Sequence, residues 1–164
     1  MDTYVLVANA LIDPHRYFRT EFRKLGPMVL QEQIKIPDGI FRKLRRGTDG
    51  LFKAVKRWSQ KNPDCIVRIT HSHIFANALA RIERQYDKQI IIGKKSHRGF
   101  CRSLAGKKAA DGQVIAVAKV LSAAVVSDDR AIHLACMVEN IPCISWTEFA
   151  RRANLSTQLS LFST

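Results

Sequence analysis

The side chains most able to perform chemistry in this chain are polar residues that follow short apolar segments. Asn9 comes directly after an apolar run at the N-terminus, and Ser127 and Asp129 follow a second apolar run near the C-terminus. Asp111 begins a helical pattern between the two. Carboxylate and amide oxygens bind Mg²⁺ and Mn²⁺, and such a cation can activate water for attack on a phosphodiester. These four residues are therefore candidates for a metal-assisted site.

Some of the acidic residues also have a purely structural interpretation. Asp111 and Asp128 stand where helix N-caps are expected, and an N-cap contributes about 1 kcal/mol with no chemistry. Asp13 precedes Pro14, which is typical of an N-cap followed by proline at the first helical position.

Other site chemistries have weaker support in the sequence. The chain has no C-x-x-C pair, so its four cysteines predict buried free thiols and neither a zinc ribbon nor a disulfide framework. His71 and His73 flank a helix start and are interpreted as cap and surface residues. The segment 93–96, Gly-Lys-Lys-Ser, lacks the upstream glycine of a phosphate-binding loop.

Short apolar runs alternate with helical patterns along the chain. Strands are predicted at 4–8, 34–36, 124–126 and 141–144, with amphipathic helices between them. Alternation of this kind favours βαβ units and a parallel sheet. At the carboxyl ends of parallel strands side chains converge, so the candidate site residues are expected in one crevice.

Several boundaries are also predicted. A helix beginning at Asp13-Pro14 should be interrupted by Gly26-Pro27, and a helix from about Ser72 should bury an apolar stripe. That stripe comprises Ile74, Phe75, Ala78, Leu79, Ile82 and Tyr86. Residues 93–108 are predicted to form a long basic loop. Residues 1–154 are predicted to be one domain, and 155–164 a disordered tail or interaction segment.

Charge is unevenly distributed. The chain has 27 Lys and Arg against 14 Asp and Glu, a net charge of +13, and the excess is concentrated in residues 15–108. Such an excess favours a polyanionic partner, with nucleic acid first. No apolar run is long enough to cross a membrane and no signal sequence precedes the first strand, so we expect a cytoplasmic protein with no membrane partner. The candidate nucleic-acid-binding residues are Arg42, Arg45, Arg46, Lys94, Lys95, Arg98, Arg102, Lys107 and Lys108.

Three short motifs resemble the PIN domain, a family of metal-dependent nucleases that includes toxin ribonucleases of bacterial toxin–antitoxin pairs. Residues 4–12, Tyr-Val-Leu-Val-Ala-Asn-Ala-Leu-Ile, resemble the family's opening strand and turn. Residues 110–118 resemble its Asp-x-x-Ile-x-Ala-x-Ala helix, and residues 125–129 resemble its Val-Thr-x-Asp ending. The resemblance covers about residues 3–152. It implies a PIN-like, three-layer α/β fold with a central, mostly parallel sheet flanked by helices.

The site implied by this resemblance is incomplete. Asp111 and Asp129 fall on two of the family's acidic positions and would be the catalytic, metal-binding pair for Mg²⁺ or Mn²⁺, with Asn9 and Ser127 supporting them. The other two acidic positions fall on Val7, which cannot coordinate a cation, and on Lys43, which reverses the charge. Asp13 is an alternative source of the missing first carboxylate. The order of elements also resembles an uncharacterised, degenerate branch of the fold.

These observations predict a PIN-fold protein that binds nucleic acid, RNA favoured, with little or no hydrolysis. One alternative is an active metal-dependent ribonuclease of toxin type that uses Asp111 and Asp129. A second is a non-catalytic subunit that docks an acidic protein partner, as a toxin docks its antitoxin. The resemblance also implies a homodimer as an assembly option.

Overall fold

The computed structural model describes residues 2–47, 50–100 and 110–155. The main sheet contains β1 (Tyr4–Leu6), β2 (Ile34–Pro37), β3 (Ile66–Val67), β6 (Ala124–Val126) and β7 (Cys143–Ile144). A separate hairpin contains β4 (Gln89–Ile92) and β5 (Lys95–Arg98). The helices are α1 (Asn9–Tyr17), α2 (Arg19–Arg23), α3 (Leu25–Leu30), α4 (Asp38–Leu44), α5 (Leu51–Lys61), α6 (His73–Tyr86), α7 (Asp111–Leu121), α8 (Arg130–Glu139) and α9 (Trp146–Arg152).

The five strands of the main sheet are all parallel and lie in the order β3-β2-β1-β6-β7. The central strand β1 pairs with β2 and β6, so that Tyr4 lies opposite Ile34 and Ala124. All three residues of β1 are buried, which explains their continuous apolar character. The predicted parallel sheet is confirmed.

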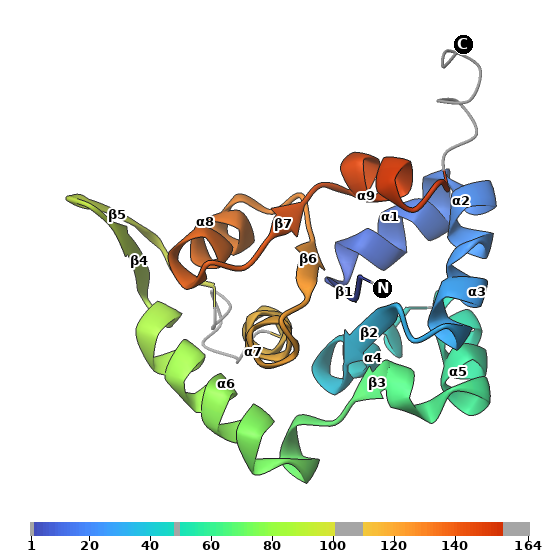
Figure 1. The fold of residues 1–164 in the computed structure, drawn as a ribbon, viewed down its shortest axis with the longest axis horizontal. Coiled ribbons are helices and arrows are strands. Elements are labelled where there is room, and N and C mark those ends of the chain that lie inside the picture. Colours follow the sequence, from blue (N-terminus) through green and yellow to red (C-terminus); the bar gives the residue numbers. More distant parts are fainter. Residues whose placement is uncertain (1, 48–49, 101–109, 156–164) are drawn as a thin grey trace.

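Helices flank this sheet. Figure 1 shows α7 and α8 on one side of the sheet and α1, α3 and α9 on the other. On the first side, α7 contacts β1, β2 and β6 and is itself covered by α6. On the second, Phe149 of α9 packs edge to face on Tyr4, with ring centroids 4.8 Å apart. The α/β class with a helix-flanked central sheet is therefore confirmed.

The first helix differs from its prediction. It begins at Asn9, two residues after the end of β1, and Pro14 lies inside it. The N-cap interpretation of Asp13 is wrong, because Asp13 stands one turn inside the helix. Gly26-Pro27 does not interrupt a helix either, since both residues lie in the first turn of α3. N–H groups in the first turn have no partner within the helix, so the N–H group that proline lacks is not needed there.

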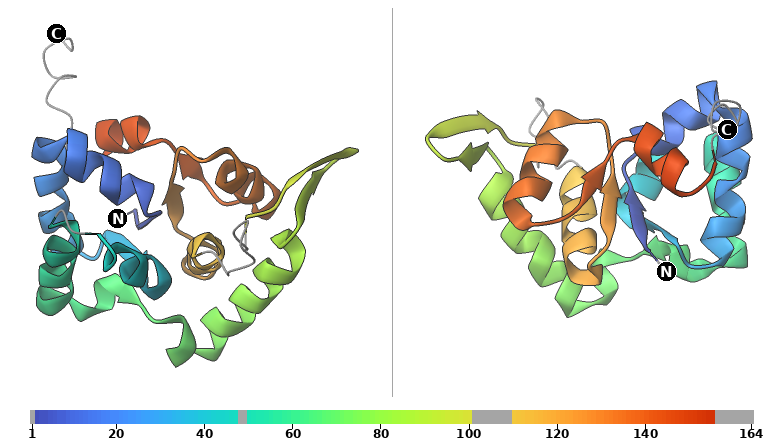
Figure 2. Two further views of the ribbon diagram at one scale, coloured as in Figure 1. Left: turned by 180° about the vertical axis from the view of Figure 1, so that it is seen from behind. Right: turned by 45° about the horizontal axis from the view of Figure 1, so that its top comes forward.

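The segment 93–108 is not one long loop. Residues 95–98 form β5, which pairs antiparallel with β4 across a two-residue turn at Gly93 and Lys94. Gly93 has a φ of +60°, which is the conformation required at the first central position of such a turn. Both views of Figure 2 show this hairpin projecting away from the main sheet at the end of α6.

Three further comparisons with the sequence analysis concern the buried stripe of α6, an additional strand and the C-terminal tail. Ile74 is 67 % exposed and does not belong to the core, whereas Ile82 and Tyr86 of the same stripe are buried. The short strand β3 was not predicted. The expected tail coincides almost entirely with residues 156–164, which lie outside the described residues.

None of the helices in the described ranges is both long and apolar enough to span a membrane.

Candidate functional site

A cavity of about 270 Å³ lies beyond the carboxyl ends of β1 and β6. It brings together all six residues of the predicted metal-assisted site, including the two at replaced acidic positions. Its polar and charged lining residues are Asn9, Asp13, Lys43, Asp111, Ser127, Asp128 and Asp129, and its apolar ones are Val7, Ala8, Ala10 and Ile132. We call this cavity the acidic pocket.

The first wall of the acidic pocket is built by the turn from β1 into α1. The Val7 N–H donates a hydrogen bond to the Val126 carbonyl at 3.4 Å, which extends the pairing of β1 with β6 by one residue. The helix α1 then begins at Asn9, after a short connection of Val7 and Ala8. Asn9 and Asp13 are four residues apart on this helix and therefore project from the same face. This spacing places Asp13 in the pocket, although the sequence pattern had favoured a helix-capping role for this residue.

The second wall follows β6. The Ser127 hydroxyl is buried and accepts a hydrogen bond from the Asp129 N–H at 3.0 Å. One Asp129 carboxylate oxygen accepts a hydrogen bond from the Ile132 N–H at 3.0 Å, so that Asp129 is the N-cap of α8. The alternative that Asp128 caps this helix is wrong, because Asp129 occupies that position. Asp129 therefore combines a structural role with a place in the acidic pocket.

Asp111 and Lys43 complete the pocket from α7 and α4. Asp111 is the first residue of α7 and makes no side-chain cap hydrogen bond, so its interpretation as an N-cap is wrong. Burial raises the pKa of Asp111, the positive charge of Lys43 lowers it, and the negative charge of Asp129 raises it, with a net increase. The charges of Lys43 and Asp129 therefore both act on the Asp111 carboxyl group.

α4 is held beside α7 by a direct contact. The Gly39 N–H donates a hydrogen bond to Gln113 Oε1 at 2.8 Å. A Cβ atom at Gly39 would lie 2.6 Å from that same oxygen, so glycine leaves room for the Gln113 amide to accept this hydrogen bond. This contact fixes the position of α4, and with it the direction from which Lys43 reaches the pocket.

The pocket residues do not fit a resident Mg²⁺ or Mn²⁺ ion in this arrangement. These cations require several oxygen ligands that converge on one point. Within residues 2–47, 50–100 and 110–155, no three Asp, Glu, His or Cys side chains gather closely enough to hold a metal ion. The ammonium of Lys43 would also repel a cation bound beside Asp111.

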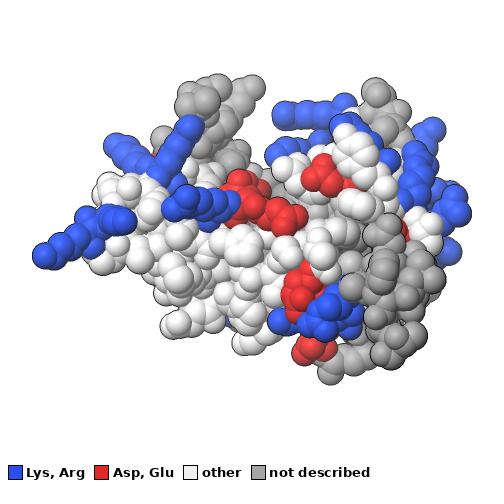
Figure 3. Space-filling model, turned by 90° about the horizontal axis from the view of Figure 1, so that it is seen from above, with Lys and Arg blue, Asp and Glu red and all other residues white. Residues whose placement is uncertain are grey.

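Basic residues lie on both sides of acidic residues when the molecule is seen from above, the side on which α9 and α1 lie. Figure 3 shows Asp and Glu near the middle of this face, with Lys and Arg toward the β4–β5 hairpin and toward α1 and α2. The predicted cations Lys94, Lys95 and Arg98 are exposed on the hairpin, and Arg42, Arg45 and Arg46 are exposed at the end of α4. Arg102, Lys107 and Lys108 lie outside the described residues.

Two of the α4 cations have partners of their own. The exposed Arg42 lies 3.8 Å from the largely buried Asp38 in an ion pair, and the Arg45 guanidinium lies 5.6 Å from the centre of the Phe52 ring. Exposed contacts of this kind are weak and leave the charge accessible to a polyanion.

Comparison with known proteins gives no family for this chain, since no family model and no curated protein matches it. Its function is therefore inferred from its own residues and from where the fold places them.

Proposed function

We propose that this protein binds nucleic acid, RNA favoured, and that its acidic pocket is a degenerate metal-nuclease site of PIN type with little or no hydrolytic activity. The observation that carries the proposal is the position of Lys43 in the pocket with Asp111. A metal-assisted nuclease needs carboxylates to hold its cation. Lys43 and Val7 both line the pocket, and the resemblance to PIN nucleases places them at two of that family's acidic positions.

The affinity for nucleic acid is attributed to the exposed cations outside the acidic pocket. Carboxylates alone would repel a phosphate chain, but a net charge of +13 outweighs them at longer range. The exposed cations of α4 and of the hairpin can neutralise several phosphates at once. Because phosphate neutralisation releases condensed counterions, affinity should fall as salt concentration rises.

A binding experiment tests this attribution with matched variants. Fluorescence anisotropy with single-stranded RNA should show that Lys94→Ala/Lys95→Ala weakens binding and flattens the plot of log K against log salt by about 0.7 for each phosphate that is no longer neutralised. The control, Lys53→Ala/Lys56→Ala, removes the same charge from α5 and should have a smaller effect. Wild-type binding that does not depend on salt would refute the electrostatic argument.

A gain-of-function variant tests the degenerate site. Val7→Asp/Lys43→Glu supplies the two missing carboxylates, so it should bind Mn²⁺ measurably by isothermal titration calorimetry where the wild type does not. A folded variant without metal binding would contradict the resemblance to PIN nucleases.

The second candidate function is an active metal-dependent ribonuclease, which is favoured by Asp13 in the pocket lining and which requires the carboxylates to move closer together than they lie in this arrangement. Asp13 adds a carboxylate to those of Asp111, Asp128 and Asp129 in the pocket. If the wild type cleaves RNA only with Mg²⁺ or Mn²⁺, and Asp13→Asn or Asp111→Asn abolishes cleavage, this candidate replaces the first.

A further inference from the structure

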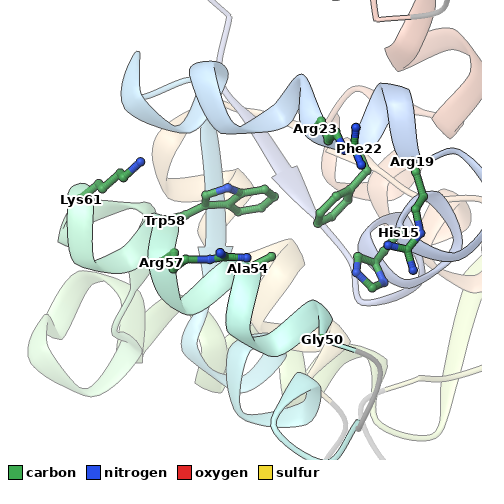
Figure 4. Close-up of a pocket in the computed structure, with 9 residues that line it drawn as sticks. All are labelled: His15, Arg19, Phe22, Arg23, Gly50, Ala54, Arg57, Trp58 and Lys61. Carbon is green, nitrogen blue, oxygen red and sulfur yellow. The ribbon is translucent and has the colours of Figure 1, made fainter.

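A second and larger cavity, of about 500 Å³, lies between α5 on one side and α1 and α2 on the other (Figure 4). It shares no lining residue with the acidic pocket. Four of its lining residues are cations, namely Arg19, Arg23, Arg57 and Lys61. The others are His15, Phe22, Gly50, Ala54 and Trp58. We call this cavity the basic pocket.

The described residues that line the basic pocket carry charge of one sign. None of them is Asp or Glu, and all four cations are exposed. Within the described part of the chain, none of the four forms an ion pair. In Figure 4 two of the cations come from α2 and two from α5, on opposite sides of the cavity. Cations from two elements that face one cavity provide a site for phosphate oxygens.

The basic pocket also has an aromatic wall. Trp58 is half-buried and packs on Phe22, with ring centroids 5.3 Å apart and planes tilted by 30°. Phe22 in turn packs edge to face on the buried His15, at 5.0 Å. A Cβ atom at Gly26 would lie 3.5 Å from the indole nitrogen, an ordinary van der Waals distance, so α3 lies near one edge of the ring. The contact with Phe22 therefore packs Trp58 into the wall of the cavity.

We propose that the basic pocket binds one unpaired nucleotide of a single-stranded nucleic acid, with its phosphate among the four cations and its base against Trp58. The inference rests on the proposed function, which it narrows from nucleic acid in general to single strands. Aromatic side chains bind bases only where the bases are unstacked, as in single strands, and a positive groove follows the phosphate chain. The volume of the cavity lies in the range of pockets that take small ligands, and a nucleotide is such a ligand.

Tryptophan fluorescence tests contact between the base and Trp58. The chain has two tryptophans, and Trp146 is buried, so Trp146→Phe leaves Trp58 as the only reporter. Single-stranded oligouridylate should quench this fluorescence, whereas a duplex of the same length should not. Uridine monophosphate should quench it only at much higher concentration. Equal potency of the mononucleotide would overturn the proposal in favour of a free nucleotide, and absence of quenching by any ligand would overturn it altogether.

A matched pair of variants gives a second test that does not need the tryptophan replacement. Arg57→Ala/Lys61→Ala removes two cations of the basic pocket, and Lys53→Ala/Lys56→Ala removes two from elsewhere on the same helix. The first variant should weaken binding of single-stranded oligouridylate about tenfold, since hydrogen bonds to charged groups are the stronger class, and the second about twofold. Equal effects of the two variants would overturn the basic pocket while leaving the proposed function intact. If the wild type binds no nucleic acid at any salt concentration, both fail.

Discussion

Replacement of Tyr86 by phenylalanine should destabilise the protein through the loss of a single hydrogen bond. The Tyr86 hydroxyl donates to a Glu139 carboxylate oxygen at 3.0 Å, and the Glu139 side chain is only 7 % exposed. Arg81 also binds this carboxylate, with one nitrogen at 3.3 Å and the other closer. These contacts join the middle and the end of α6 to the end of α8, which makes them a link between two helices.

The expected loss follows from the charge of the acceptor. A hydrogen bond to a charged group contributes about 1.5–3 kcal/mol. Because Arg81 remains bound to the carboxylate in the variant, we expect the lower end, about 1.5–2 kcal/mol in the free energy of unfolding. For a chain of this size that corresponds to a decrease in Tm of about 3–8 °C.

The loss should also depend on pH. Burial raises the pKa of Glu139, but hydrogen bonds from Arg81 and Tyr86 outweigh burial and leave the pKa below its ordinary value of 4.5. A lowered pKa in the folded state stabilises the fold above pH 4.5, and this stabilisation is lost as pH falls through the folded-state pKa. The difference between wild type and Tyr86→Phe should therefore be largest at neutral pH and shrink in acid.

Urea unfolding followed by circular dichroism at pH 7 and at pH 3 measures both effects. The control is Tyr17→Phe, which removes the same hydroxyl from a residue that is 67 % exposed. A destabilisation by Tyr86→Phe of less than about 0.5 kcal/mol at pH 7, or one no larger than that of the control, would refute this account of the hydrogen bond.

Three other substitutions give further tests, each measured by thermal unfolding. Asp129→Ala removes the N-cap of α8 and should cost about 1 kcal/mol, whereas its neighbour Asp128→Ala should be nearly neutral; equal losses would contradict the assignment of the cap. Gly99→Ala should be strongly destabilising, because its Cβ would lie 2.3 Å from the backbone oxygen of Tyr86, and an unchanged Tm would show that this approach is not required. Asp111→Asn should raise Tm at pH 7, because the pKa of Asp111 is raised in the folded state and its charged form therefore costs stability above that pKa. The gain in Tm should vanish below pH 3.8, where the carboxyl group is protonated in both the folded and the unfolded state. A lower Tm of the variant at pH 7 would contradict this argument.

The sheet and the location of the acidic pocket could be predicted because both depend on local pattern. Buried parallel strands are continuous apolar runs, and residues that follow them at the carboxyl ends must meet. Asn9, Ser127 and Asp129 therefore converge without any knowledge of the loops, and Asp111 joins them as the first residue of α7. The place of Lys43 depended on the resemblance alone, since nothing in its local pattern distinguishes it from other exposed lysines.

The start of α1 was missed because a turn signal was given too much weight. Asp13-Pro14 is a common helix opening, but proline is also tolerated inside a helix when packing compensates for one missing hydrogen bond. The helix starts at Asn9 instead, which turns Asp13 toward the pocket. A spacing of four residues between Asn9 and Asp13 was the signal that could have indicated a shared helical face.

The hairpin was missed because its charge was interpreted as evidence for a loop. The run Gln89–Ile92 is rich in β-branched residues and is followed by a glycine, which is a hairpin signal. Its partner Lys95–Arg98 contains no large apolar side chain and therefore has no alternating pattern. The basic pocket was missed for a different reason, since its cations belong to helices that are distant in sequence.

The β4–β5 hairpin has two strands, so each has an outer edge with backbone N–H and C=O groups that no other strand of the described residues pairs. Open edges of this kind favour association of one molecule with another, and lysine is among the residues that oppose it. Ile91 on β4 is exposed, and its apolar side chain adds to the tendency of this edge to associate with another molecule. Lys94 and Lys95 are therefore expected to oppose such association whether or not they contact a ligand. Removal of both charges should lower the concentration at which the protein self-associates, and light scattering would detect this without any nucleic acid present.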